Sequence, residues 1–295
     1  MSVEVNGRAI AQKIFDEVRN KVLALKKDSY NVKLSIIAIG NDSEMELYIR
    51  NKRKYAGYCG IEIEVFYFPA DVSEGDLIQK IYELNSSDCS GFIVQLPLPS
   101  HIRKDVLDII SPIKDVDCLT SENLGKVFKD YRSARFLPCA SQAMIDIFDE
   151  YKIDVEGKKA VVVGASDLVG KPCAGVLLNM GATVTICHKA TKDLSEFIKD
   201  ADIVISAVGI PGLIKGEWIK RGAVVIDIGT RVVDGKVFGD VEYDEAKKRA
   251  SIITPVPGGV GIITVAELMR NTLKAFFYSN SAIGSPSTTE PPSWM

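Results

Sequence analysis

The chain has 295 residues, 46% of them hydrophobic and 25% charged, which predicts a globular protein with two domains. Its 36 basic and 39 acidic residues give a formal net charge of −3, and neither a basic block nor interleaved aromatic residues occur, so nucleic acid is not expected as a partner. No apolar run reaches membrane-spanning length, so we expect no membrane partner either.

The first half of the chain alternates between helical and strand periodicity. This alternation is typical of parallel sheets in which a helix follows each strand. Helices are expected near residues 7–27, 44–58, 74–86 and 102–110, and strands near 33–39, 61–68 and 91–96. The N-terminal half is therefore predicted to be a βα-repeat domain that binds the substrate.

The second half follows a link around Pro138 and repeats the alternation. A helix is expected near residues 141–151, and strands near 159–163, 182–187, 202–206 and 223–228. This spacing predicts a doubly wound parallel sheet of the Rossmann type, so the fold class is α/β with two domains. Helical periodicity ends at Tyr278, and residues 279–295 show none, which predicts a flexible tail.

A glycine turn marks the start of the second sheet. The β-branched run at residues 160–163 stops at Gly164-Ala165-Ser166, and the chain continues to Pro172 in the pattern G-x-S-x-x-x-G-x-P. A turn of this kind that opens a helix exposes unpaired N–H groups, which bind the pyrophosphate of a dinucleotide. The commoner pattern is G-x-G-x-x-G, and similar turns occur in proteins that bind nothing, so a purely structural turn is the alternative.

The next strand ends in His188-Lys189, and this ending bears on the choice between NADP and NAD. At this distance an NAD-binding fold usually carries an acidic residue for the ribose hydroxyls. Lys189 could instead pair with a 2′-phosphate, so the sequence favours NADP over NAD. A merely solvated lysine is the alternative.

Three places in the first half follow the carboxyl ends of strands, where ligands bind in open parallel sheets. Tyr48 and Lys52 are four residues apart and share one helix face, Gln95 precedes two prolines that stop a strand, and Asp117 precedes the link to the second half. Lys52 could belong to a solvated basic face, Gln95 could bond a turn, and Asp117 could cap a helix or lie in solvent.

The cysteines and histidines limit the metal chemistry. Six cysteines are spread along the chain without a C-x-x-C pair, so reduced thiols are expected. His101 and His188 are the only histidines, which excludes a histidine-rich metal site and argues against a histidine-based catalytic pair. The N-terminus lacks the features of a secretory signal, so we expect a cytoplasmic protein.

Five motifs occur in order along the two halves. They are Tyr48-x-x-x-Lys52, residues 94–99, Lys114-Asp115-Val116-Asp117, the glycine turn at Gly164, and residues 253–261. In these motifs, and in residues 207–212 and 225–229, the chain resembles the bifunctional methylenetetrahydrofolate dehydrogenase/methenyltetrahydrofolate cyclohydrolase family over residues 3–277. The resemblance implies oxidation of methylenetetrahydrofolate to the methenyl cation with NADP, hydrolysis of that cation to formyltetrahydrofolate, and a homodimer.

The resemblance also implies roles at the folate site. Lys52 would be the catalytic residue of the cyclohydrolase, and Gln95 its orienting partner. Tyr48 would stack on the folate ring system, and Asp117 would accept hydrogen bonds from the pterin. Further substrate contacts are implied for Leu96, Pro257, Gly258 and Gly259. We expect Lys52 and Gln95 to share a cleft that opens toward the bound nucleotide.

On the cofactor side, the resemblance implies that Gly164, Ala165 and Ser166 approach the phosphates, with Lys189 at the 2′-phosphate and Thr230 near the nicotinamide. The folate-binding domain would comprise residues 1–139 and the helix at 265–278, the NADP-binding domain residues 140–264, and the tail residues 279–295.

The chain departs from the family's usual residues at several positions. Met45 replaces a serine, Cys118 a glycine, Ala140-Ser141 a Thr-Pro pair, Ile262 a proline, Ala165 an arginine, and Lys189 a serine. Met45 and Ile262 adjoin the folate site, so a dehydrogenase with weak or no cyclohydrolase activity is one alternative. An amino-acid or shikimate-type dehydrogenase, and a dinucleotide-binding sensor without turnover, are two others.

Overall fold

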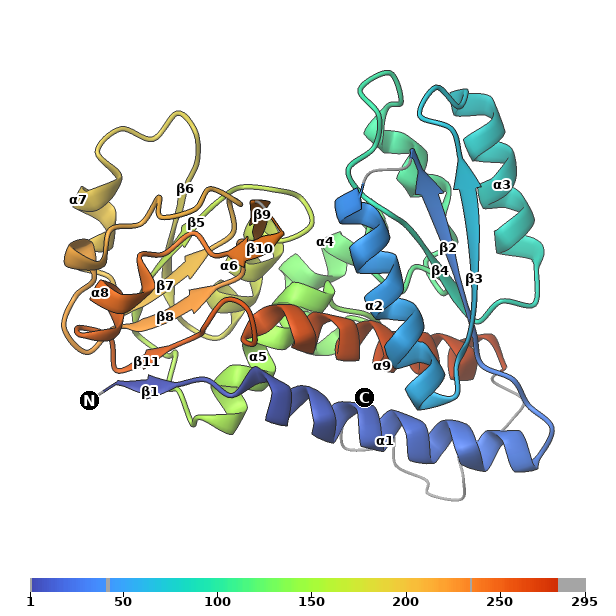
Figure 1. Ribbon diagram of the computed structural model, residues 1–295, viewed down its shortest axis with the longest axis horizontal. Coiled ribbons are helices and arrows are strands. Elements are labelled where there is room, and N and C mark those ends of the chain that lie inside the picture. The colour runs from blue at the N-terminus through green and yellow to red at the C-terminus, as the bar shows by residue number, and fades with distance from the viewer. Residues whose placement is uncertain (1, 41–42, 234, 281–295) are drawn as a thin grey trace. The chain divides into compact units, whose positions relative to one another are not determined.

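The computed structural model describes residues 2–40, 43–233 and 235–280 (Figure 1). The chain forms two compact units, which we name by their sheets. The six-stranded unit comprises the chain up to Gln12 together with Gly125–Ser133 and Pro138–Thr264. The three-stranded unit comprises Lys13–Leu124, Ala134–Leu137 and the chain from Val265 onward.

The three-stranded sheet is parallel and has β2 (Lys33–Ile39) at its centre. Its order is β3-β2-β4, with β3 at Glu62–Phe68 and β4 at Gly91–Val94. Six of the seven β2 residues are buried, because a central parallel strand has neighbours on both edges and both faces. The three strands predicted in the first half are thus confirmed, although β4 ends two residues early.

Three helices predicted for the first half are confirmed, namely α1 (Gly7–Lys27), α2 (Ser43–Cys59) and α3 (Glu74–Ser86). The helix α4 (Ser121–Asp130) was not predicted, and the last helix, α9 (Val260–Ser279), begins before the expected residue 265. The segment predicted as an α-helix at 102–110 is instead the short 3₁₀ helix η1 (Lys104–Ile109), so that prediction was wrong in type. A second 3₁₀ turn, η2 (Tyr131–Ser133), follows α4.

The six-stranded sheet is also parallel throughout and has the order β1-β11-β8-β7-β5-β6. Its strands are β1 (Val3–Glu4), β5 (Lys159–Val163), β6 (Thr183–Cys187), β7 (Ile203–Ser206), β8 (Val224–Asp227) and β11 (Ile252–Ile253). The four strands predicted for the second half are confirmed as neighbours in a doubly wound sheet. The pairs formed by β1 and β11 were not predicted, because two residues show no periodicity.

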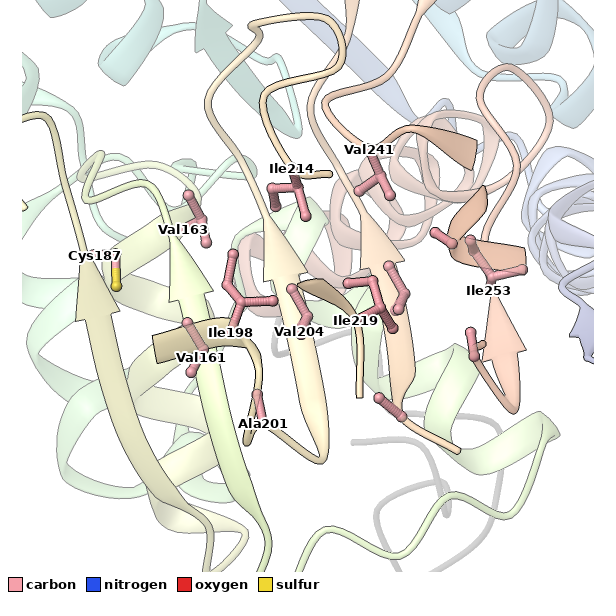
Figure 2. Close-up of a cluster of buried hydrophobic side chains, with 14 residues drawn as sticks. Val161, Val163, Cys187, Ile198, Ala201, Val204, Ile214, Ile219, Val241 and Ile253 are labelled. Carbon is pink, nitrogen blue, oxygen red and sulfur yellow. The ribbon is translucent and has the colours of Figure 1, made fainter. Parts of the chain in front are cut away.

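Short elements complete this unit. They are α5 (Cys139–Glu150), α6 (Gly170–Asn179), α7 (Leu194–Ile198), η3 (Gly216–Trp218), the antiparallel pair β9 (Arg231–Val233) and β10 (Lys236–Phe238), and α8 (Tyr243–Lys247). Figure 2 shows a buried cluster in which Val161 and Val163 of β5, Val204 of β7 and Ile198 of α7 contribute side chains. Burial of these aliphatic groups holds α7 and the following loops against the sheet.

All six cysteines are buried free thiols, in agreement with the sequence. Over the residues that the structure describes, no helix combines the length and apolar character needed to cross a membrane. In that same part of the chain, no cluster of three or more histidine, cysteine or acidic side chains is arranged to hold a metal ion. The tail predicted at 279–295 lies outside the described residues from 281 onward, and Ser279 is the last residue of α9.

Candidate active site

Lys52 and Gln95 form a direct contact in the three-stranded unit. The Nζ atom of Lys52 donates a 2.6 Å hydrogen bond to Oε1 of Gln95. Lys52 is half-buried, whereas its basic neighbours Arg50, Arg53 and Lys54 are exposed. The expectation that the amine and the amide lie together is therefore confirmed, and the reading of Lys52 as part of a solvated face was wrong. That their cleft opens toward the nucleotide stays a prediction.

The backbone fixes the orientation of the Gln95 side chain. Its N–H donates to the carbonyl of Ile37 at 2.8 Å, which continues the pairing of β4 with β2 by one residue. Its side-chain Nε2 donates to the carbonyl of Leu96 at 3.1 Å, so Oε1 is the atom turned to Lys52. Gln95 thus presents a neutral acceptor with a defined direction to the ammonium group.

Tyr48 lies one turn before Lys52 on α2 and is 36% exposed. Residues four apart on a helix share a face, so the phenol and the amine lie on the same side of α2. Met45 lies three residues before Tyr48 and is half-buried. The departure at Met45 therefore adjoins the Tyr48–Lys52 face, as expected from the sequence.

Asp115 and Asp117 differ sharply in their surroundings. Asp115 is 0% exposed, and its carboxylate accepts hydrogen bonds from Leu119 N, Asn123 Nδ2, and both the N–H and Oγ1–H of Thr120 at 2.7–2.9 Å. Asp117 is half-buried. The Oγ1 of Thr120 accepts from the N–H of Asn123 at 3.3 Å and so caps α4, and Asp115 in turn accepts from Thr120. Asp117 is the carboxylate of this segment nearer to solvent.

Cys118 has a left-handed backbone conformation with φ of +58° directly after Asp117. This is the position at which the resemblance leads us to expect glycine, the residue that adopts positive φ most readily. The Cys118 side chain is buried, and its Sγ donates to the carbonyl of Phe136 at 3.6 Å. Burial, with the charges of Asp115 and Asp117, raises the pKa of this thiol well above its ordinary value, so it stays protonated.

The glycine turn of the six-stranded unit lies at the carboxyl edge of β5. Gly164 has φ of +120°, and a β-carbon there would collide with the carbonyl oxygen of Ala207. The helix does not open at the turn, as the sequence suggested, but at Gly170. Ser166 Oγ accepts hydrogen bonds from the N–H groups of Val169 and Gly170 at 3.2 and 3.3 Å. The Ser166 hydroxyl thus pairs with two of the amides that the sequence predicts to be available to a ligand.

Lys189 lies at the same edge of the sheet as the glycine turn. Its strand β6 pairs with β5, and the N–H of Gly164 donates to the carbonyl of Cys187 at 2.9 Å. Lys189 follows two residues later and is exposed. The turn and the cation are therefore side by side along the carboxyl edge, as a dinucleotide with a 2′-phosphate requires.

Thr230 lies beside the segment that follows β7. Gly209, whose φ is +76°, is positioned so that a β-carbon on it would lie 3.5 Å from the carbonyl oxygen of Thr230. Thr230 itself is half-buried. The loops after β7 and β8 therefore run together at the carboxyl edge.

The Pro257-Gly258-Gly259 loop packs closely on the start of α1. A β-carbon on Gly7 would collide with the carbonyl oxygens of Gly258 and Gly259, and Gly258 has φ of +105°. Pro257 is exposed, Gly258 is half-buried and Gly259 is buried. Part of this loop is thus open to a ligand, and the rest serves packing.

The two units divide the candidate residues between them. Tyr48, Lys52, Gln95, Leu96 and Asp117 belong to the three-stranded unit, and Gly164, Ala165, Ser166, Lys189, Thr230, Pro257, Gly258 and Gly259 to the six-stranded unit. Within each unit, the structure brings together Lys52 with Gln95 and the glycine turn with the strand that precedes Lys189.

Sequence reasoning missed a pair of buried carboxylates. Asp227, which ends β8, is 3% exposed, and Asp240 is 0% exposed. Burial is the main cause that raises the pKa of Asp227 to about 7, and the nearby Asp240 carboxylate raises it further. An aspartate that ends a hydrophobic strand is a signal for Asp227. Asp240 has no local signal, because its backbone donors lie 30 and 32 residues earlier.

Comparisons with known proteins agree on one family. Residues 5–117 match the model for the tetrahydrofolate dehydrogenase/cyclohydrolase catalytic domain, and residues 138–280 match the model for its NAD(P)-binding domain. The bifunctional protein FolD of Hydrogenobaculum sp. (strain Y04AAS1) is 44% identical over 274 residues, which are 92% of this chain and 98% of that relative.

Two solved structures are similar over nearly the whole chain. The methylenetetrahydrofolate dehydrogenase-cyclohydrolase (FolD) of Trypanosoma brucei, in complex with NADP and an inhibitor, has a TM-score of 0.90 at 40% identity, covering 94% of this chain and 98% of that one. The bifunctional enzyme FolD of Campylobacter jejuni has a TM-score of 0.90 at 39% identity, covering 95% of this chain and 100% of that one.

The raised pKa of Asp227 makes stability depend on pH. An unfolded aspartate ionises near pH 4, whereas the folded one keeps its proton until about pH 7, so this group's contribution to stability falls as pH rises between those values. Asp227→Asn resembles the protonated form and does not titrate. We expect the difference in unfolding free energy, variant minus wild type, to rise by about 3 kcal/mol from pH 5 to pH 8.

Denaturant unfolding at both pH values measures this difference. Asp202→Asn is the matched control, because the Lys220 ammonium and the Lys159 N–H hold the pKa of Asp202 below its ordinary value, and its difference should stay constant over this range. An Asp227→Asn difference that is the same at pH 5 and pH 8 would contradict the assignment of the proton.

Proposed function

Because the chain belongs to the tetrahydrofolate dehydrogenase/cyclohydrolase family, we propose that it oxidises 5,10-methylenetetrahydrofolate to the 5,10-methenyl form with NADP and hydrolyses that form to 10-formyltetrahydrofolate. These are consecutive steps of one-carbon metabolism. The observation that carries the proposal is the hydrogen bond between Lys52 and Gln95, which joins the two residues that the family resemblance assigns to the hydrolytic step.

The oxidation demands placement more than proton transfer. The carbon that loses hydride lies between two nitrogens, whose lone pairs stabilise the resulting cation, so no general base is needed. Bound NADP supplies the hydride acceptor. A chain with only two histidines is compatible with this chemistry.

The hydrolysis needs a group that moves a proton. Water adds to the methenyl cation, and protons must then leave the new hydroxyl and reach the departing nitrogen. We assign this transfer to the Nζ of Lys52, which is half-buried and held in direction by Gln95. Tyr48, on the same face of α2, would stack on the folate ring.

We assign pterin recognition to Asp117 rather than Asp115. Asp115 already accepts four hydrogen bonds from the protein and is fully buried. A carboxylate that meets the N–H edge of a pterin discriminates strongly, because a ligand without that edge leaves the acceptor unpaired. Leu96 and the loop from Pro257 to Gly259 would supply the remaining contacts.

The cofactor residues fit a dinucleotide phosphate. Gly164 packs against the carbonyl of Ala207 at the carboxyl end of β5, and Lys189 is exposed at the same edge of the sheet. We therefore place the phosphates at Gly164, Ala165 and Ser166, the 2′-phosphate at Lys189, and the nicotinamide end near Thr230.

The domain assignment and the cellular location stay predictions. Folate binding is assigned to residues 1–139 with the helix at 265–278, and NADP binding to residues 140–264. A cytoplasmic location is expected from the sequence.

Replacing Lys52 should separate the two activities. We expect Lys52→Ala to lower the cyclohydrolase kcat by about 100-fold or more, the usual contribution of a positioned proton carrier, while much of the dehydrogenase activity remains. The decay of the methenyl chromophore and the reduction of NADP measure the two steps separately. Lys54→Ala, an exposed lysine of the same helix, is the control and should leave both rates unchanged.

Full cyclohydrolase activity in Lys52→Ala would remove Lys52 from the mechanism. In the wild type, the methenyl product could instead accumulate and decay no faster than it does in buffer alone. That result would support the dehydrogenase-only alternative raised by Met45.

Replacing Lys189 should change the choice of cofactor. A charge-assisted hydrogen bond to phosphate contributes about 1.5–3 kcal/mol, so Lys189→Ala should raise the KM for NADP by about tenfold or more and leave the KM for NAD nearly unchanged. Lys192→Ala, an exposed lysine of the same loop, is the control. Equal changes in both Michaelis constants would show that Lys189 does not meet the 2′-phosphate.

We further propose a homodimer that uses the edge strand β6. This strand ends the six-stranded sheet, and Ile186 on it and Leu178 on the neighbouring α6 are 38% and 58% exposed. An uncovered sheet edge with apolar side chains can pair with the same edge of a second copy.

A single charge at this edge should break the dimer. Ile186→Lys would occur twice in a two-fold interface, so we expect sedimentation to show a monomer for this variant and a dimer for the wild type. Val233→Lys, at an aliphatic residue of β9 that is 43% exposed, is the control and should stay dimeric. A dimeric Ile186→Lys protein would place the interface elsewhere.

A further inference from the structure

Asp240 organises the backbone that follows β7. Its Oδ2 accepts hydrogen bonds from Ser206 Oγ at 2.7 Å and from the N–H of Val208 at 2.8 Å, and its Oδ1 accepts from the N–H of Ile210 at 2.7 Å. The side chains of Val208 and Ile210 are 38% and 50% exposed. One buried carboxylate thus holds alternate amides of a loop whose apolar side chains face solvent.

The same carboxylate touches the loop that follows β8. A β-carbon on Gly229 would overlap the carboxylate of Asp240, so the two groups are in contact. The N–H groups of Ile228 and Gly229 both donate to the carbonyl of Ser206, at 2.8 and 3.1 Å. Asp240 therefore lies between the two loops that bring Gly209 beside Thr230.

Asp227 holds the backbone next to Asp240 by a hydrogen bond. Its Oδ2 accepts a 2.9 Å hydrogen bond from the N–H of Val241, the residue after Asp240. Its own N–H donates at 2.7 Å to Oγ1 of Thr254, which leads into the Pro257–Gly259 loop. On the other side, the carbonyl of Asp240 accepts from the N–H of Ile214 at 3.0 Å. The network is continuous from Thr254 to the loop at 208–210.

We propose that Asp240 is a positioning residue for the cofactor, which sets the conformation of residues 207–210 and 228–230 so that they can receive the nicotinamide half of NADP. This inference rests on the proposed function, since Thr230 is assigned to that end of the cofactor. Asp240 is buried beneath the loops and acts through their backbone amides and not by contact with the ligand.

A carboxylate suits this role better than an amide of the same shape. Each oxygen of Asp240 accepts from a backbone N–H, and a backbone N–H cannot turn away. In Asp240→Asn, one of these donors would face the NH₂ group of the new side chain, so the loop would have to move. A cofactor that binds only the original conformation then binds more weakly in proportion to the fraction of protein that keeps it.

The test compares NADP binding in Asp240→Asn and in the wild type. We expect the Kd for NADP, measured by calorimetric titration, to rise by about tenfold, and the KM for NADP to follow. Hydrolysis of the methenyl substrate without nucleotide should stay within about twofold of the wild type, because no cofactor takes part. Without ligand, the amides of Val208 and Ile210 should exchange hydrogen faster than in the wild type.

Asp202→Asn is the matched control, since Asp202 also accepts a backbone N–H in this unit, from Lys159 at the amino end of β5. It should leave NADP binding unchanged. An unchanged Kd in Asp240→Asn would overturn the inference, as would parallel losses of NADP binding and hydrolysis, which indicate general destabilisation.

Ser206→Ala provides a second variant if Asp240→Asn does not fold. It removes the hydroxyl donor and keeps both backbone donors, so we expect a rise of about threefold in the Kd for NADP. No rise would overturn the inference. A wild-type protein that binds NADP but does not oxidise methylenetetrahydrofolate would contradict the proposed function, while the binding comparison would still decide the role of Asp240.

Discussion

The chemistry that we propose for the three-stranded unit depends on the hydrogen bond between Lys52 and Gln95. A single charged hydrogen bond contributes about 1.5–3 kcal/mol, too little to bring a helix and a strand end together. The sheet does this instead. Buried β2 pairs with β4, the pairing extends to Gln95 through Ile37, and α2 follows β2 along the chain. The hydrophobic core thus places the two polar groups, and their mutual attraction only sets the final direction.

In both units, a buried aspartate pairs with backbone N–H groups of a loop. Loops at the carboxyl edge of a sheet carry N–H groups that no strand can pair, and burying such groups unpaired destabilises the fold. Asp115 accepts three backbone and side-chain donors and a hydroxyl before α4, and Asp240 gathers two amides and a hydroxyl after β7. In each case the carboxylate pairs the amides of the neighbouring loop, and the residue assigned to the ligand, Asp117 or Thr230, lies beside that loop.

The sequence predicted what periodicity and local chemistry determine. Strands of four or more buried residues, the helix faces that carry Tyr48 and Lys52, and the glycine turn at Gly164 were all recognised. The pairing of β1 with β11 was not, because it joins two-residue segments from opposite ends of the chain. That Asp115 is fully buried and accepts hydrogen bonds from Thr120 and Asn123 could not be predicted from the spacing of the aspartates, because these donors come from the start of α4 and the residue before it. The role of Asp240 could not be predicted either, because its hydrogen-bond donors are distant in sequence.

The distribution of polar residues follows from what the two reactions demand. Hydride loss from a carbon between two nitrogens needs a fixed geometry, and water addition to a cation needs one proton carrier. The two reactions therefore need few residues that take part chemically and many that hold the substrate and the cofactor in position. The structure has this proportion: one half-buried lysine meets the amide of Gln95, whereas buried aspartates, serine and threonine hold the loops around the proposed sites. Burial raises the pKa of Asp227 to about 7, and the Asp240 carboxylate beside it raises that pKa further, so Asp227 keeps its proton in this interior up to about that pH.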